Sequence, residues 1–132
     1  MTSWLNSPTQ EGGGDLVPRS FTALYTVPDY TQFQCNITDI EYAPDKDAQR
    51  DPSLVEEIHK KIDQEGLRWP IILKASENNK YKYKCYIGNN RVAYASNHGY
   101  NDITAIVVTS SADKLHIMQY CKRIDEHGFD SE

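Results

Sequence analysis

Residues 80–99 read KYKYKCYIGNNRVAYASNHG, and this stretch carries most of the information about the fold. Its first half alternates polar and apolar residues up to Ile87, which is typical of a strand with one buried face. Gly88 follows, and residues 89–98 are predicted as a short helix that Gly99 closes. The stretch therefore predicts a strand, a tight glycine turn and a helix in direct succession.

The glycine turn has the ingredients of an anion site. The first turn of a helix has N–H groups without intrahelical partners and a partial positive charge. Gly88 lets a ligand approach the backbone closely, and Arg91 adds a guanidinium group that suits phosphate oxygens. The alternative is structural: Gly88 makes the turn, Asn89 caps the helix and Arg91 forms a surface ion pair. The spacing of these residues fits both interpretations.

The residues on either side predict further elements around this turn. Residues 51–66 begin with Asp-Pro and end with Gly, typical signals for the start and stop of a helix. The apolar run 69–73 predicts a strand, which we expect to form a hairpin with residues 80–87. An alternating segment, 33–40, predicts an earlier strand.

Two more elements complete the pattern. Residues 103–108 are rich in β-branched side chains and predict a strand. Residues 111–124 predict a helix with Ile117, Cys121 and Ile124 on one side. The expected fold class is α/β (α+β), a small mixed sheet with packed helices.

The expected organisation is an extended N-terminal arm (1–32), one domain (33–110), and a C-terminal helix and tail (111–132). The arm contains three consecutive glycines and three prolines and has no sustained periodicity. Its aromatic residues, such as Trp4 and Phe21, either form a segment that binds a protein partner or fold back onto the domain.

Two sequence boxes within residues 35–109 resemble the ParB/sulfiredoxin superfamily. The first is a Gly-x-x-x-Pro-Ile segment that enters a strand, at residues 66–71. The second is the Gly-x-x-Arg turn at residues 88–91, which enters a helix. Each box is a weak signal by itself, whereas the pair, with a strand between them, is more specific. The resemblance implies a ParB/sulfiredoxin-like domain over residues 33–110.

The resemblance also implies a set of nucleotide-binding residues. In ParB-like members the second box binds the phosphates of CTP or ATP, and the first box lines the base and sugar. An arginine that precedes the first helix of the family often faces the nucleotide or DNA. Transferred by position, these expectations fall on Gly88, Asn89, Asn90, Arg91, Arg50, Gly66, Arg68, Trp69 and Pro70.

Two departures from the family pattern bear on catalysis. Sulfiredoxins place their catalytic cysteine directly after the box glycine, where this chain has Asn89, so peroxiredoxin repair is not expected. ParB proteins carry an acidic residue that helps to hold magnesium, and the nearest counterpart here is the amide Gln119. An amide is a poor substitute for a charged magnesium ligand, which weighs against metal-dependent hydrolysis.

The function implied by the resemblance is nucleotide or phosphate-ligand binding, with phosphotransfer or slow NTP hydrolysis as an open question. Mg²⁺ with ATP or CTP is the cofactor set that such activity implies. The alternative is a non-catalytic protein-interaction or DNA-associated regulatory module, of the kind found in phages and mobile elements, that keeps the fold without the chemistry.

Composition and net charge bear on the remaining classes of function and on the expected location of the protein. The chain has 132 residues and a net charge of −5, so tight autonomous binding to DNA is not expected. It has neither an apolar run long enough for a membrane span nor a secretory signal. Three widely spaced cysteines predict no disulfide framework and a reducing, cytoplasmic location. The four histidines have no metal-ligand spacing, and His59 is expected to be an ordinary surface residue.

A row of lysines on the predicted strand 80–87 leaves two interpretations open. Lys80, Lys82 and Lys84 share one face of that strand. They could follow a nucleic-acid backbone with Tyr86 stacking beside them. They could equally form the solvated outer face of an edge hairpin, where lysines discourage aggregation.

Overall fold

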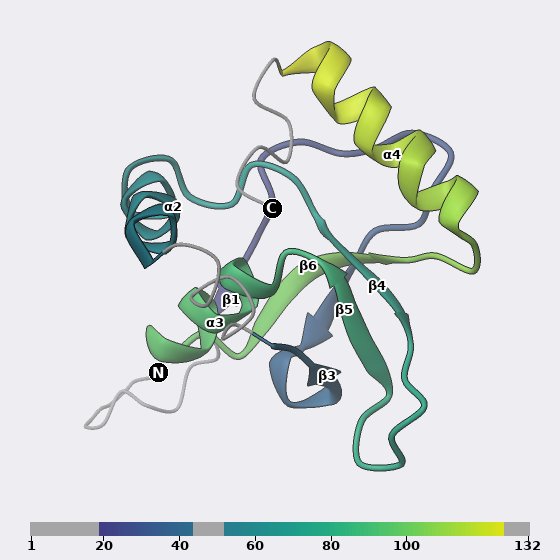
Figure 1. Ribbon diagram of the computed structural model, residues 1–132, viewed down its shortest axis with the longest axis horizontal. Coiled ribbons are helices and arrows are strands. Elements are labelled where there is room, and N and C mark those ends of the chain that lie inside the picture. Colours follow the sequence, from purple (N-terminus) through teal and green to yellow (C-terminus); the bar gives the residue numbers. More distant parts are fainter. Residues whose placement is uncertain (1–18, 44–51, 126–132) are drawn as a thin grey trace, which may run out of the picture.

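A computed structural model of the chain describes residues 19–43 and 52–125, and these residues form a six-stranded mixed sheet with helices on both faces (Figure 1). The elements in chain order are β1 (Ser20–Phe21), β2 (Phe33–Asn36), the 3₁₀ turn η1 (Ile37–Asp39), β3 (Ile40–Glu41), α2 (Pro52–Glu65), β4 (Ile71–Ala75), β5 (Tyr83–Ile87), α3 (Asn89–Asn97), β6 (Asp102–Val107) and α4 (Ser111–Ile124). The predicted α/β class is confirmed.

Strand β6 pairs with three other strands of the sheet. It pairs in parallel with β4 and β1 and antiparallel with β2. On the other side of β4, the strand β5 pairs antiparallel, which confirms the predicted hairpin. The strand order is β1-β6-β4-β5-β3, and β2 joins the sheet at β6.

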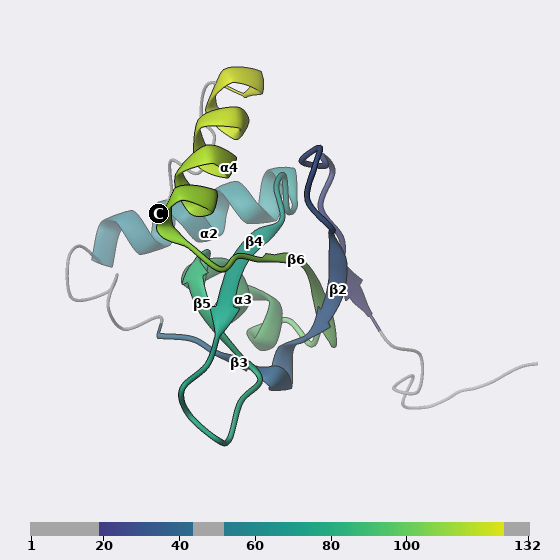
Figure 2. The same ribbon diagram turned by 90° about the vertical axis from the view of Figure 1, so that its right-hand side faces the viewer.

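The single strand expected over residues 33–40 is wrong. The segment forms two short strands, because β2 pairs with β6 whereas β3 pairs with β5. In Figure 2, β2 lies to the right of β3 and β5, and the turn η1 carries the chain from β2 to β3. The N–H of Ile37 donates to the carbonyl of Asn101, 3.0 Å away, and holds this crossing in place.

The sheet separates two hydrophobic cores. One lies between the sheet and helices α2 and α3, and the other lies between the sheet and α4 (Figure 1). The first includes Ile58, Ile62, Ile71, Leu73, Cys85, Val92 and Ala95. The second includes Trp69, Ile72, Ile106, Ile117 and Cys121. Successive residues of β4 alternate between the two cores, as the pleat of a strand requires.

The described part of the predicted arm, residues 19–32, packs onto this domain. Phe21 is buried, and its ring stacks on Tyr100 with the centroids 4.6 Å apart. The N–H groups of Leu24 and Tyr25 donate to carbonyls of residues 67 and 68, each over 2.9 Å. Of the two alternatives for Phe21, folding back onto the domain is therefore the one that the structure shows, whereas Trp4 lies outside the described residues.

The two long helices begin and end close to their predicted positions. Pro52 is the first residue of α2, and Gly66 ends the helix with φ +74° and an N–H bond to the Ile62 carbonyl over 2.8 Å. Helix α4 has its predicted bounds, but Ile124 is 57% exposed instead of facing the core. Within the part of the chain that the structure describes, none of the helices has the length and apolar character needed to span a bilayer.

Candidate functional site

The turn between β5 and α3 depends on Gly88. Its φ of +110° lies in the left-handed region, where a side chain is strained. A Cβ on this residue would lie 2.7 Å from Cγ2 of Ile71, the first residue of β4. Gly88 is therefore required both by the backbone conformation and by the close approach of β4.

Asn89 does not cap the helix, contrary to the structural alternative for this turn. Gly88 occupies the N-cap position, and no side chain makes a cap hydrogen bond there. The Oδ1 atom of Asn89 instead accepts a hydrogen bond from the N–H of Ala43, 2.9 Å away. This bond ties the start of α3 to the segment that follows β3.

Asn90 is the most unusual residue of the turn. Its side chain is only 1% exposed, yet neither its amide nitrogen nor its amide oxygen has a hydrogen-bond partner in the described structure. An amide has two donors and an oxygen acceptor, and most buried polar groups in proteins are paired. A buried amide with no partner on either atom is rare in folded proteins and needs an explanation.

The backbone adds to the polarity of this place. The N–H groups of Arg91 and Val92 donate to the Gly88 carbonyl, each over 3.0 Å. The N–H groups of Asn89 and Asn90 precede them, at positions that have no intrahelical acceptor. These groups and the helix dipole favour a negative charge at the start of α3.

The resemblance assigns a nucleotide role to three further residues, Pro70, Gly66 and Arg50. Pro70 is buried and precedes Ile71, the residue that contacts the Gly88 turn, so this end of the box lies beside the turn. Gly66 ends α2. Arg50 lies outside the described residues, and its predicted role stays a prediction.

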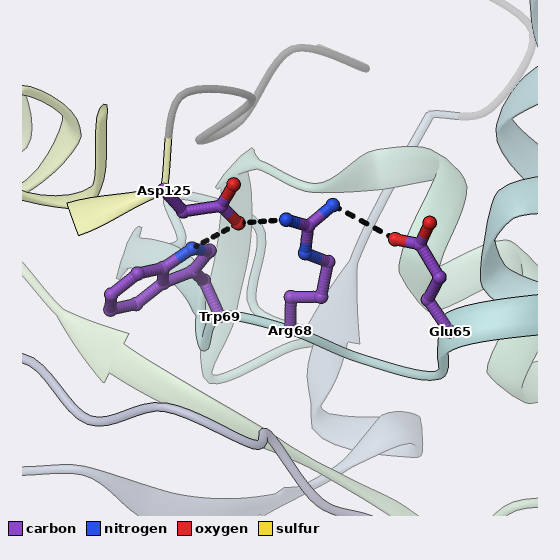
Figure 3. Close-up of polar contacts among 4 residues, drawn as sticks. All are labelled: Glu65, Arg68, Trp69 and Asp125. Atoms are coloured by element: carbon purple, nitrogen blue, oxygen red, sulfur yellow. Dashed lines mark hydrogen bonds and ion pairs between the residues drawn. The ribbon is translucent and has the colours of Figure 1, made fainter. Parts of the chain in front are cut away.

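Arg68 and Trp69 have structural partners instead (Figure 3). Arg68 forms ion pairs with Glu65, at 2.8 Å, and with Asp125 directly after α4. The indole N–H of Trp69 donates to the same Asp125 carboxylate over 3.3 Å. The Trp69 ring is 2% exposed and packs on Tyr25, with the centroids 4.9 Å apart. These contacts fasten the end of α4 to the loop before β4, and the proposed nucleotide roles of Arg68 and Trp69 are untested.

Asp125 explains why Ile124 faces outward. Asp125 is buried at the position that follows the helix, and its carboxylate joins Arg68 and Trp69 (Figure 3). The chain turns inward at Asp125, so Ile124 points away from the core.

Removal of the Asp125 carboxylate is expected to be costly. Asp125→Ala should lower the free energy of unfolding by about 2 kcal/mol, because it leaves the half-buried Arg68 and the indole N–H without their shared acceptor. Glu65→Ala is the matched control: it removes the other, exposed partner of Arg68 and should cost less than about 1 kcal/mol. Urea melts of both variants measure the difference, and equal losses would contradict this account.

The environment of His59, on helix α2, differs from the one expected from the sequence. It was expected at the surface, but it is half-buried and its ring meets Tyr94 edge-on, with the centroids 5.8 Å apart. Its Nε2 atom is buried without a hydrogen-bond partner in the described structure. The signal was present in the sequence, since the apolar stripe of a packed helix is wide enough to include position 59 beside Ile58 and Ile62.

Cys35, Cys85 and Cys121 are buried. Burial raises the pKa of Cys35 to about 11 and that of Cys121 to about 12. Both thiols therefore stay protonated at neutral pH, and a protonated thiol is a weak nucleophile.

No group of three or more histidine, cysteine or acidic side chains that could hold a metal ion occurs in residues 19–43 and 52–125.

Comparisons with known proteins find similarity among solved structures. No protein-family model matches the chain, and no curated protein matches it. Among solved structures, sulfiredoxin from Arabidopsis thaliana is similar with a TM-score of 0.46 and 19% sequence identity, over 65% of this chain and 93% of that chain. The likeness concerns the arrangement of helices and strands alone.

Proposed function

We propose that this protein binds a nucleotide, or another ligand with a phosphate group, at the start of α3. The observation that carries this proposal is the buried Asn90 amide, which has no hydrogen-bond partner in the described structure. Such a group costs about 1–3 kcal/mol per unpaired atom in the free protein, and a ligand that pairs with it recovers this energy.

The donors at this place favour an anion. The early N–H groups of α3 and the Asn90 Nδ2 group offer hydrogens, and the positive end of the helix dipole adds to them. Arg91, half-buried in the same helical turn, contributes a positive charge. Phosphate oxygens are acceptors that match all of these groups.

The side-chain oxygen of Asn90 restricts the chemical class of the ligand further. A fully ionised phosphate has no hydrogen to offer to Oδ1, so phosphate alone would leave this acceptor unpaired. A ribose hydroxyl or the amino group of a base supplies the missing donor. A nucleotide therefore satisfies both ends of the amide, which supports a nucleotide over free phosphate.

Phosphotransfer or slow hydrolysis of the nucleotide belongs to this proposal as its catalytic extension. Magnesium would arrive with the nucleotide, as Mg²⁺ bound by ATP or CTP usually does. The second candidate is the interaction module without nucleotide chemistry. It is favoured by one observation, the structural partners of Arg68 and Trp69 in the box that should line the base (Figure 3).

A thermal-shift and calorimetric screen of the full chain tests the proposal. The ligands are ATP, CTP, GTP, ADP and inorganic pyrophosphate, with and without Mg²⁺, and adenosine and cytidine serve as controls without phosphate. A nucleotide at 100 times its dissociation constant should stabilise the fold by about 2.7 kcal/mol, and the nucleosides should not. The absence of any shift at millimolar nucleotide would reject nucleotide binding and favour the interaction module.

A further inference from the structure

The lysine-bearing face of β5 is not the outer face of an edge hairpin, contrary to one of the two sequence interpretations. Strand β5 is not at the edge of the sheet, because β3 pairs with its other side through Tyr83 and Lys84. Along the same face, Tyr86 packs against the core beneath α4. The lysine face therefore continues into the space between the sheet and the start of α4.

A surface cavity of about 410 Å³ lies at this position, which we call the Tyr86 pocket. Its lining residues come from the ends of β4, β5 and β6 and from the start of α4: Lys74, Ala75, Tyr86, Val107, Val108, Thr109, Ser110 and Ser111. Val107 and Val108 give it an apolar wall, and the three hydroxyl residues give it a polar one. The start of α3 belongs to the opposite core, so the Tyr86 pocket is separate from the proposed nucleotide site.

Positive charges converge on this pocket. The Nζ atoms of Lys74 and Lys114 lie 4.7 and 4.5 Å from the centroid of the Tyr86 ring. Lys84 is directly opposite Lys74 in the register of β4 and β5, but it lines a neighbouring cavity and is opposite Glu41 in the register of β3 and β5. Like charges directly opposite in a sheet are destabilising. Within the described ranges, none of these three lysines has a carboxylate within ion-pair distance.

The acidic groups nearby already have hydrogen-bond partners, and Asp113 takes two of its partners, Thr109 and Ser110, from the wall of the pocket. The Asp113 carboxylate accepts hydrogen bonds from the hydroxyls of Ser110, at 3.1 Å, and Tyr30, at 3.2 Å. Glu41 accepts from the Ser76 hydroxyl over 3.0 Å. Glu41 and Glu77 line a neighbouring cavity on the far side of Lys74 and Lys84, not the Tyr86 pocket.

The Tyr86 hydroxyl has a neutral hydrogen-bond partner and two lysine neighbours. It lies 3.4 Å from the Ser111 hydroxyl. The hydrogen bond with Ser111, and after it the charges of Lys114 and Lys74, lower the pKa of Tyr86 although partial burial opposes this shift. The positions of Lys74 and Lys114 beside the Tyr86 ring therefore carry the argument for a bound anion.

We propose that the Tyr86 pocket is a second anion site, which takes a phosphate monoester. A monoester carries about −1.5 to −2 charges at neutral pH, so it can offset the repulsion between Lys74 and Lys114 better than a singly charged diester. The Ser111 hydroxyl supplies a neutral donor, and the valine wall contacts an apolar or aromatic group that carries the phosphate. Phosphoamino acids and small phosphorylated metabolites share this chemistry.

An NMR titration of the full chain tests the second site. The probes are phenyl phosphate, phosphoserine, inorganic phosphate and the singly charged methyl sulfate. Phenyl phosphate should give saturable shifts at Lys74, Tyr86 and Ser111, and methyl sulfate should bind at least several-fold more weakly. Tighter binding of phosphoserine than of phenyl phosphate would instead identify a peptide-like carrier for the same monoester chemistry. Absence of saturable shifts would overturn the proposal, and so would tighter binding of a single-stranded DNA oligomer than of any monoester.

Charge-matched variants separate this site from a general charge effect. Lys74→Gln with Lys114→Gln should weaken phenyl phosphate binding about tenfold or more, which corresponds to about 1.4 kcal/mol. The control, Lys60→Gln with Lys122→Gln, removes the same charge from exposed positions that do not line the pocket, and should change binding less than twofold. Equal weakening in both double variants would overturn the proposal. Asn90→Leu should leave phenyl phosphate binding at Tyr86 unchanged, so failure of the nucleotide site and failure of this site are distinguishable.

Discussion

Replacement of Gly88 by alanine is expected to lower the free energy of unfolding by about 3 kcal/mol, enough to unfold a marginal domain. Two costs combine in this value. A residue with a side chain at φ +110° is strained by about 1–2 kcal/mol. The new Cβ would also lie 2.7 Å from Cγ2 of the fully buried Ile71, and relief of such overpacking typically costs about 1–3 kcal/mol.

Gly66→Ala separates the two costs. Gly66 also has a positive φ, +74°, but a Cβ there would have no atom within 4 Å. This variant should show the backbone cost alone, about 1–2 kcal/mol. Urea melts of the two variants give the comparison. Equal losses would mean that β4 does not press against the Gly88 turn as the structure shows.

Replacement of Asn90 by leucine is expected to change stability and binding in opposite directions. Leucine has a similar size and removes two unpaired polar atoms from the interior, so stability should rise by about 1–2 kcal/mol. The proposed nucleotide loses a donor and an acceptor at once, and its affinity should fall at least about tenfold. Few substitutions stabilise a protein and weaken its ligand binding at the same time, so this variant is a sharp test of the proposed nucleotide site.

Asn97→Leu is the control for the Asn90 variant. Asn97 is exposed at the other end of α3, so the same chemical change there should shift stability by a few tenths of a kcal/mol and leave binding intact. Chemical denaturation measures the stability of each variant, and calorimetric titration measures its affinity for the nucleotide. A loss of stability in Asn90→Leu would show that the amide is paired inside the folded protein, and unchanged affinity would show that the ligand does not contact it.

The parts of the fold that sequence reasoning predicted are those with local signals. The hairpin of β4 and β5 follows from two neighbouring apolar segments, and the bounds of α4 follow from the spacing of its apolar residues. The split of residues 33–40 into β2 and β3 has no such signal. It is decided by the strands that these residues pair with, and those strands lie far away along the chain.

The residues of the candidate site also differ in how far the sequence could predict them. The conformation of Gly88 was predictable, because glycine before a helix is a local signal. The burial of Asn90 was not, since asparagine near a helix start ordinarily acts as a cap and remains partly solvated. The roles of Arg68 and Trp69 beside Asp125 depend on where α4 ends relative to β4, which only the packing of the second core decides.

The central place of β6 has a consequence for how this protein is made. Its residues pair with β1 at Ser20 and with β2 at Phe33, more than sixty positions earlier in the chain. A ribosome that adds about 5–20 residues per second takes several seconds to cover that distance. During this time Phe21, Phe33 and Cys35 have no strand to pair with, and contacts so distant in sequence also slow the later folding step. A nascent chain of this protein therefore exposes its first strands to aggregation or chaperone binding until β6 leaves the ribosome.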